Sequence, residues 1–284
     1  MSIKSKIYNL VGHSIATITK RYYFEDYVRV YPNGIRLDRW GRMCQPEKKH
    51  INNFLNHRKF YIFASQFVRD KSVADIGCGS GYGCEILKKS GAALVRGSDI
   101  SKRAIKFAKS RYSDFTDFTI QGITKMGKYP DDCFDISISS EVLEHIKEYR
   151  MEKKAIGELK RITRNEGLLI IGTPNSEMLD RHGFYFDEIN DLFKESFSQF
   201  CIFENALVPF GDKRSLWEER LSEGRVGVII SEIINLSETV LPDGVHPEIK
   251  SGLEAGRYMF STYTVDTTLL HNTHSWIVMA INNK

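Results

Sequence analysis

Short apolar runs alternate with amphipathic stretches through the centre and the C-terminal part of the chain. The apolar runs predict buried strands at residues 72–76, 93–100, 118–123, 134–140, 168–172, 200–208 and 275–282. Apolar residues spaced three and four positions apart predict helices at about 51–69 and at 82–90, 102–112, 151–163 and 186–197. This alternation is typical of an α/β fold with a doubly wound parallel sheet, whose ligands bind beyond the carboxyl ends of the strands.

Two segments extend this α/β pattern. Residues 1–60 are predicted to form a helical extension, because apolar positions such as Ile3 and Ile7 are spaced three and four apart. We expect this extension to cap a main domain at 61–284, and contact with an anionic membrane surface is the alternative. Residues 209–274 separate the last two predicted strands, and we expect this insertion to form a substrate lid or a homodimer surface.

Composition and charge narrow the class of protein. Of the 284 residues, 42% are hydrophobic and 27% are charged, which is ordinary for a globular domain and excludes a disordered or fibrous chain. Lys and Arg number 40 against 36 for Asp and Glu, a balance that disfavours a dedicated nucleic-acid binder. The five cysteines include no C-x-x-C pair, and neither a membrane span nor a signal peptide is recognised. We therefore expect a cytoplasmic protein with reduced thiols.

The loop after the first predicted strand reads VADIGCGSGYG and contains the glycines Gly77, Gly79 and Gly81. A dinucleotide-binding loop needs G-x-G-x-x-G, and the third glycine would fall on Tyr82 or Cys84 in the two registers available. A P-loop needs Gly-Lys-Ser/Thr after the turn, and none follows. The spacing therefore argues against a loop built for phosphate groups.

The remaining pattern, G-x-G-x-G preceded by Asp75, is typical of a loop that holds S-adenosylmethionine. This cofactor has no phosphate, and the helix that begins after Gly81 can favour its carboxylate. Asp75 can favour its ammonium group, directly or through water. Asp99 ends the second predicted strand 18 residues after Gly81, where a carboxylate can accept both ribose hydroxyls. Asp99 could instead cap the helix that begins at about Lys102.

Four motifs together, VADIGCGSGYG, GSDIS, FDISISSEVLEHI and ITRNEGLLIIGTPN, resemble the class I S-adenosylmethionine-dependent methyltransferases. The resemblance covers residues 70–175. The preceding HRKFYIFASQFVRDKSVADIG resembles the lead-in of a bacterial subgroup often encoded with glycan and lipopolysaccharide biosynthesis. The family resemblance implies a Rossmann-like, mostly parallel sheet of seven strands with the last strand antiparallel.

The resemblance also implies which residues contact the cofactor. We expect these contacts from Asp75, Gly77, Cys78, Gly79, Gly81, Asp99, Ile100, Ile123, Ser140 and Glu141. The chain departs from the family after the third strand, where Gly122-Ile123 replaces the usual Gly-Asp whose acid reaches the adenine amine. Ile123 can still pack on the adenine face.

Acceptor chemistry is expected at the loop after the fourth strand, SSEVLEH. His145 is a candidate base for a hydroxyl acceptor, because its ordinary pKa is near ~6.5, or it braces the loop. His182, in a basic and aromatic loop, is the second catalytic candidate. Glu141, Glu144 and His145 also resemble the E-x-x-E-H cluster with which small-RNA 3′-end methyltransferases bind magnesium together with a later histidine. Magnesium prefers oxygen ligands, so we predict a metal-free site.

The sequence thus predicts an S-adenosylmethionine-dependent methyltransferase that O-methylates a sugar or another small molecule, including nucleotide- or lipid-linked acceptors. One alternative is a magnesium-dependent RNA 2′-O-methyltransferase, which the modest net charge of +4 disfavours. The other alternative is a binding module that holds the cofactor without catalysis.

Overall fold

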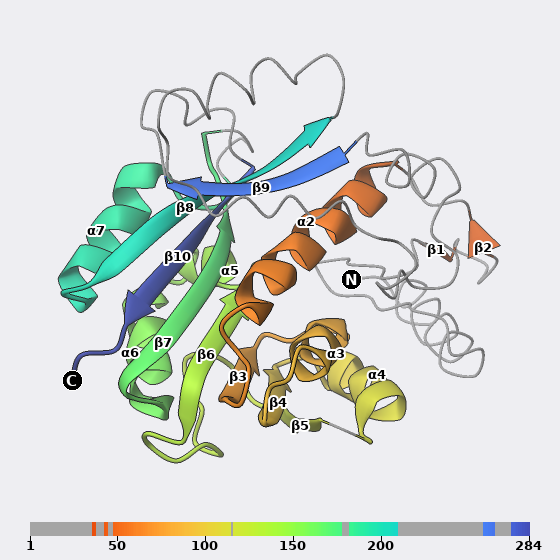
Figure 1. Cartoon of the computed structure of the whole chain (residues 1–284), viewed down its shortest axis with the longest axis horizontal. Coiled ribbons are helices and arrows are strands. Elements are labelled where there is room, and N and C mark those ends of the chain that lie inside the picture. The colour runs from red at the N-terminus through yellow and green to blue at the C-terminus, as the bar shows by residue number, and fades with distance from the viewer. Residues whose placement is uncertain are drawn as a thin grey trace.

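The computed structural model describes residues 36–37, 43–44, 48–114, 116–177, 182–209, 258–264 and 274–284. Within this part of the chain, the main sheet has eight strands in the order β5-β4-β3-β6-β7-β10-β8-β9 (Figure 1). The strands are β3 (Ser72–Ile76), β4 (Leu94–Asp99), β5 (Asp117–Ile120), β6 (Phe134–Ser140), β7 (Thr163–Pro174), β8 (Phe200–Pro209), β9 (Tyr258–Thr264) and β10 (Ser275–Ile281). A separate two-stranded sheet pairs β1 (Arg36–Leu37) with β2 (Met43–Cys44).

The sheet is mixed, and this corrects the expectation of a mostly parallel, seven-stranded sheet. The strands β5, β4, β3, β6 and β7 are parallel to one another. The last strand in the chain, β10, is antiparallel to both β7 and β8, as expected. The eighth strand, β9, comes from the predicted insertion and pairs antiparallel with β8. Its aromatic and β-branched residues favour a strand, and it covers the edge that β8 would otherwise leave open.

Helices cover both faces of the sheet. They are α2 (Lys48–Ser65), α3 (Tyr82–Lys89), α4 (Lys102–Tyr112), α5 (Leu143–Lys147), α6 (Glu152–Ile162) and α7 (Phe186–Ser196). The helices α2, α3 and α4 share one hydrophobic core with residues such as Ile170 of β7. The helices α5, α6 and α7 share the other core with residues such as Ile171. Alternate side chains of β7 therefore serve opposite faces, as strand geometry requires.

The predicted boundary between residues 60 and 61 falls inside α2, whose buried side chains hold it on the sheet. Phe60 is buried over β7, where a side chain at Gly172 would meet its ring at 2.8 Å. Tyr61 is buried over α3, where a Cβ on Gly83 would lie 2.1 Å from the Tyr61 ring. This close contact positions α2 above the loop that connects β3 to α3.

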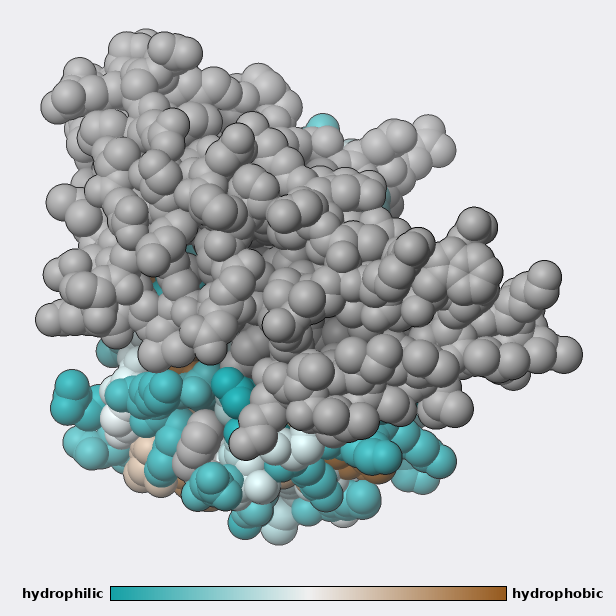
Figure 2. All heavy atoms as spheres, turned by 90° about the vertical axis from the view of Figure 1, so that its right-hand side faces the viewer, coloured by the Kyte–Doolittle hydropathy of each residue, from teal (hydrophilic) through white to brown (hydrophobic). Residues whose placement is uncertain are grey.

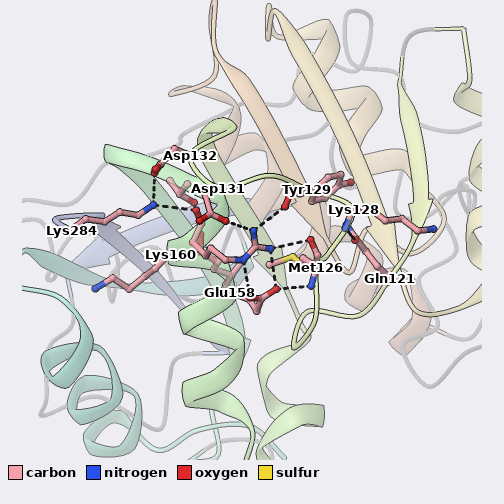
Figure 3. A network of polar contacts seen from close by, with 12 residues as sticks. Gln121, Met126, Lys128, Tyr129, Asp131, Asp132, Glu158, Lys160 and Lys284 are labelled. Atoms are coloured by element: carbon pink, nitrogen blue, oxygen red, sulfur yellow. Dashed lines mark hydrogen bonds and ion pairs between the residues drawn. The ribbon is translucent and has the colours of Figure 1, made fainter.

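A polar network lies at the end of the sheet where the strands β6 and β7 begin (Figure 3). The Arg161 guanidinium of α6 forms ion pairs with Glu158 and Asp131 and donates hydrogen bonds to the carbonyl oxygens of Tyr129 and Met126. Lys284 contacts Asp132 in the same region. The network ties α6 to the segment between β5 and β6, on the side opposite the glycine loop, and its role is structural.

The outer surface of α4 is polar. Lys102, Lys106 and Lys109 are exposed, while Ile105 and Phe107 are buried. The described residues on the side of the molecule seen in Figure 2 are mainly hydrophilic. Among the described helices, none combines the length and the apolar composition that crossing a membrane requires. The helix predicted from Ile3 onward, and the insertion apart from β9 and the end of β8, lie outside the described residues.

Two glycine substitutions test the packing of α2 on α3. Gly83→Ala should lower the free energy of unfolding by about 1–3 kcal/mol, because the new methyl group overlaps the buried Tyr61 ring. Gly157→Ala is the matched control, since nothing lies within 4 Å of its added Cβ in α6. That control should raise stability by about 0.5–1 kcal/mol through helix propensity. Urea unfolding followed by circular dichroism measures both, and equal effects would contradict the described contact.

Candidate cofactor and acceptor site

The glycine loop between β3 and α3 adopts a backbone conformation that favours glycine. Gly77, Gly79 and Gly81 have φ angles of 82°, 53° and 85°. A Cβ on Gly77 would lie 2.3 Å from Cγ2 of Val142, so the loops that follow β3 and β6 touch at this point. Gly81 is the N-cap residue of α3. The alternating glycines are therefore required by backbone angle and by the close approach of a neighbouring loop.

Asp99 connects the glycine loop to the beginning of α4. Its Oδ2 accepts a hydrogen bond from the Gly79 N–H at 2.9 Å, and its Oδ1 accepts one from the Ser101 N–H at 2.7 Å. Ser101, not Asp99, caps α4, because its Oγ accepts from the Ala104 N–H at 3.2 Å. A carboxylate offers about four acceptor sites, so Asp99 can hold the loop and accept hydroxyl groups at the same time.

The two apolar residues expected near adenine occupy different environments. Ile100 follows Asp99 and is 78% exposed. The side chain of Ile100 lies beside Gly122, whose added Cβ would be 3.5 Å from the Ile100 Cδ1. Ile123 is buried in the core beneath α5, α6 and α7. Ile100 thus offers an open apolar surface next to Asp99, whereas Ile123 mainly supports the sheet.

Asp75, just before the glycine loop, is held by side chains of α2 and α3. Its carboxyl group is fully buried and accepts hydrogen bonds from the Tyr61 hydroxyl at 3.1 Å and the Cys84 thiol at 3.2 Å. Burial raises the pKa of Asp75 to about 7, with a smaller contribution from the charge of Asp99, while the two hydrogen bonds oppose the rise. Because the group is buried between α2 and α3, the expected direct contact with the cofactor ammonium does not fit its position.

Cys78 is also buried, and burial raises the pKa of its thiol to about 11. The Cys78 backbone is tied to β4, because its N–H donates to the Ser98 carbonyl at 2.9 Å. The Gly77 N–H donates to the same oxygen at 2.7 Å. Any contribution of Cys78 to a ligand site comes from this fixed backbone, since the thiol stays neutral and faces the core.

Ser140 and Glu141 lie at the carboxyl end of β6, next to the glycine loop. Ser140 is buried. Glu141 has a positive φ of 55°, and its N–H donates to the Gly172 carbonyl at 2.8 Å. Glu141 is half-buried, and desolvation raises the pKa of its carboxyl group above the ordinary value.

The structure brings the two predicted catalytic histidines together. The rings of His145 and His182 are 5.4 Å apart between centroids. The His145 Nε2 atom lies 3.6 Å from Oε1 of Glu144, and one ligand atom from each of the three residues lies within 4.8 Å of the others. Burial lowers the pKa of His145, and the neighbouring His182 lowers it further. Burial raises the pKa of Glu144 well above its ordinary value, with a further rise from Glu141.

Contacts to backbone carbonyl groups hold the loop that carries His182. Gly183 has a φ of 127°, and a Cβ there would lie 2.1 Å from the Pro174 carbonyl oxygen. The Phe184 carbonyl accepts a hydrogen bond from the indole N–H of Trp276 at 2.9 Å. The Lys147 amine donates to the Gly183 carbonyl at 3.0 Å. A cavity of about 240 Å³ opens beside this loop and is lined by Glu144, Lys147, Glu148, His182 and Gly183.

Three contributors to the site are absent from the sequence prediction. Tyr61 and Cys84 hold Asp75, and Thr173 donates from its hydroxyl to Oε2 of Glu144 at 3.2 Å. Tyr61 lies on a helix that the periodicity predicts, yet its pairing with Asp75 depends on how α2 crosses the sheet. Thr173 belongs to a strand whose predicted end, at 172, falls one residue short of it.

Comparisons with known proteins agree with this geometry. Residues 74–171 match the sequence family described as "Methyltransferase domain". A "probable S-adenosylmethionine-dependent methyltransferase" of Mycobacterium tuberculosis is 27% identical over 122 residues, 43% of this chain and 42% of that protein. A ubiquinone biosynthesis O-methyltransferase of Rhizobium johnstonii is 30% identical over 166 residues, 50% of this chain and 64% of that protein. The alignments therefore span less than two thirds of either relative.

A solved structure of an S-adenosylmethionine-dependent methyltransferase from Thermotoga maritima has the same fold, with a TM-score of 0.50 at 15% identity over 83% of this chain and 95% of that one. The segment that matches the methyltransferase domain family, residues 74–171, runs from β3 to β7. It includes the glycine loop, Asp99, and Glu144 and His145 of α5. Residues 74–171 are thus similar to a methyltransferase domain, and the relatives that match the chain include proteins named as S-adenosylmethionine-dependent.

The raised pKa of Asp75 predicts a pH-dependent stability. In the unfolded chain Asp75 ionises near its ordinary pKa of 3.8, but in the folded protein it ionises at about 7. Its contribution to the free energy of unfolding is therefore present at low pH and is lost as pH rises between about 4 and 7. Asp75→Asn removes this ionisation, so the variant should gain stability relative to the wild type as pH increases.

Urea unfolding of both proteins at roughly pH 5 and pH 8 measures the difference. Asp117→Asn is the control, because Asp117 is exposed at the start of β5. A stability difference between Asp75→Asn and wild type that stays constant with pH would contradict the assignment.

Proposed function

We propose that the chain is an S-adenosylmethionine-dependent methyltransferase that methylates a hydroxyl group of a sugar or another small molecule. The observation that supports this proposal is that two features lie at the same end of the sheet, where the parallel strands have their carboxyl ends. The glycine loop, held by Asp99, lies at the carboxyl ends of β3 and β4. The Glu144–His145–His182 cluster lies just beyond the carboxyl end of the adjacent strand β6. A cofactor in the first feature would face an acceptor in the second.

The cofactor would be held mainly by fixed backbone and by Asp99. The Asp99 carboxylate would accept the ribose hydroxyls, and the exposed Ile100 would pack on the adenine. The amino end of α3, which begins after Gly81, would favour the methionine carboxylate. Ser140 and Glu141 would complete the pocket from β6.

Methyl transfer is an in-line displacement, so alignment supplies much of the rate. The acceptor oxygen attacks the methyl carbon, an O–C bond forms, and the C–S bond breaks with its electron pair on sulfur, which leaves S-adenosylhomocysteine. The hydroxyl proton must move to a base. His145 suits this task, because its lowered pKa keeps the imidazole neutral near pH 7 and able to accept a proton.

The relatives support a small-molecule acceptor. Four of them are ubiquinone biosynthesis O-methyltransferases, whose name describes methylation of a small-molecule oxygen. A nucleotide- or lipid-linked sugar, suggested by the lead-in sequence around α2, is the narrower form of this proposal. The net charge of +4 gives an RNA acceptor no comparable support. The side chains of Glu144, His145 and His182 lie together beside the proposed cofactor site, and this favours an enzyme over a protein that only binds the cofactor.

Asp99→Ala tests the cofactor site. The substitution should weaken S-adenosylhomocysteine binding by at least about 100-fold, because two charge-assisted hydrogen bonds of about 1.5–3 kcal/mol each are lost. Isothermal titration calorimetry measures the affinity, and circular dichroism checks that the fold survives loss of the contacts to Gly79 and Ser101. Asp117→Ala, at an exposed position on the neighbouring strand, should bind like wild type. Wild-type protein that ignores S-adenosylhomocysteine would refute the proposed function.

His145→Ala tests the acceptor side. We expect the rate of methyl transfer to fall by about 10²–10⁴-fold while S-adenosylhomocysteine affinity stays unchanged, because the residue acts on the acceptor proton. Transfer of radiolabel from S-adenosylmethionine into the small-molecule fraction of a cell extract measures the rate. The wild-type rate should decline on acidification only below pH 6.5, the ordinary pKa of histidine, since burial lowers the pKa of His145. Label that enters only the RNA fraction would overturn the small-molecule acceptor.

A further inference from the structure

The helix α2 carries a buried amine against the sheet. The ring of Phe63 lies 5.4 Å from the ring of Phe203 in β8, so this side of α2 faces the sheet. Lys59 lies one turn before Phe63 on the same side of the helix and is only 1% exposed. Burial lowers the pKa of the Lys59 amine to about 7. A basic group is therefore enclosed between α2 and the strands beneath it.

Two histidines lie close to this amine. His274 directly precedes β10, where its carbonyl accepts from the Asn175 N–H at 3.1 Å and its N–H donates to the Asn205 carbonyl at 3.2 Å. Desolvation lowers the pKa of His274, and the charge of Lys59 lowers it further. Desolvation also lowers the pKa of His57 in α2, with a smaller contribution from His274. The three basic groups thus come from two segments and lie near enough to repel one another when charged.

Two atoms beside these groups have no hydrogen-bond partner within the described part of the chain. Asn205 is only 2% exposed, and its Nδ2 donates to the Ser275 hydroxyl at 2.8 Å, but its Oδ1 accepts no hydrogen bond. The Nδ1 atom of His274 has no partner either. Buried polar atoms normally have partners, so these two atoms point to a polar ligand. His57 and His274 are half-buried, and a ligand can reach the group through their exposed surface.

The charges of the group favour an anion. Asn205 lies on the same face of β8 as Phe203, whereas the neighbouring acid, Glu204, lies on the opposite face, because side chains alternate along a strand. An anion among the three basic groups would offset both their repulsion and their desolvation. A phosphate suits separate point charges, whereas a carboxylate is matched best by the planar fork of an arginine.

We propose that Lys59, His57 and His274 bind a phosphate group of the methyl acceptor. In the sheet, β10 and β8 are the second and third strands from β6. At the usual spacing of neighbouring strands, the phosphate lies about 10–14 Å from the end of β6, beside which His145 faces the acceptor hydroxyl. This inference rests on the proposed function and narrows its acceptor to a phosphorylated molecule, such as a sugar that carries a diphosphate. The phosphate belongs either to a nucleotide or to a lipid carrier, and the two sources need different probes.

Calorimetric titration of the full chain with inorganic pyrophosphate tests the site. We expect a dissociation constant below about 1 mM, and His274→Ala and Lys59→Met should each weaken binding by at least about 10-fold. Lys106→Met is the matched control, because it removes the same charge from an exposed position of α4. This control should change the affinity by less than about 3-fold. His274 is half-buried, so His274→Ala keeps the test interpretable if Lys59→Met fails to fold.

Larger probes identify the source of the phosphate. Uridine diphosphate glucose stands for a nucleotide-linked acceptor and farnesyl pyrophosphate for a lipid-linked one, and the tighter of the two assigns the source. Each should bind at least about 10-fold more tightly than its uncharged counterpart, glucose or farnesol. Malonate should bind at least about 10-fold more weakly than pyrophosphate. Equal affinity for malonate and pyrophosphate, or for each probe and its uncharged counterpart, would overturn the phosphate site.

Unchanged pyrophosphate affinity in folded His274→Ala would also overturn it, as would displacement of S-adenosylhomocysteine by pyrophosphate, because the proposed cofactor site lies at β3 and β4. Affinity for S-adenosylhomocysteine is measured on the same samples. Wild type that binds S-adenosylhomocysteine but not pyrophosphate would refute the phosphate site and leave the methyltransferase proposal standing. Wild type that binds pyrophosphate but not S-adenosylhomocysteine would refute the methyltransferase proposal and leave an anion site.

Discussion

The carboxylate of Asp99 joins two backbone segments that approach each other only in the folded chain. One oxygen holds the Gly79 N–H of the glycine loop, and the other holds the Ser101 N–H at the start of α4. The loop can follow this path because its glycines accept positive φ angles and lack side chains that would collide with Val142. Asp75 supports the loop from the opposite side through Tyr61 and Cys84. The geometry of the cofactor edge depends on these two carboxyl groups, one at the surface and one buried.

The two halves of the site are built in different ways. The half proposed to hold the cofactor consists largely of backbone held by hydrogen bonds, so its shape follows directly from β3, β4 and the turns between them. The half proposed to bind the acceptor consists of side chains on α5 and on the loop before α7. That loop is anchored by the Trp276 indole of β10 and by the Lys147 amine. An antiparallel strand from the end of the chain thereby positions His182 beside His145.

Local sequence signals predicted the parallel half of the fold closely. The predicted bounds of β6 and α4 coincide with the structure, because each has a strong period and clear end signals. The glycine spacing correctly favoured S-adenosylmethionine over phosphate ligands. The short helix α5 was missed because five residues show too little periodicity. The strand β9 was missed because it lies in a segment whose pairing partner, β8, is about 50 residues away.

The chain alone therefore determined the strand–helix order, the glycine loop, the identity of its cofactor class and the acid at the end of β4. These features depend on neighbours in sequence and on the backbone angles of single residues. Only the tertiary structure decided that Asp75 is buried against Tyr61, that Ile100 is exposed while Ile123 is in the core, and that Glu144, His145 and His182 converge. These outcomes depend on contacts between segments far apart in sequence, whose distances are set by how helices and strands pack.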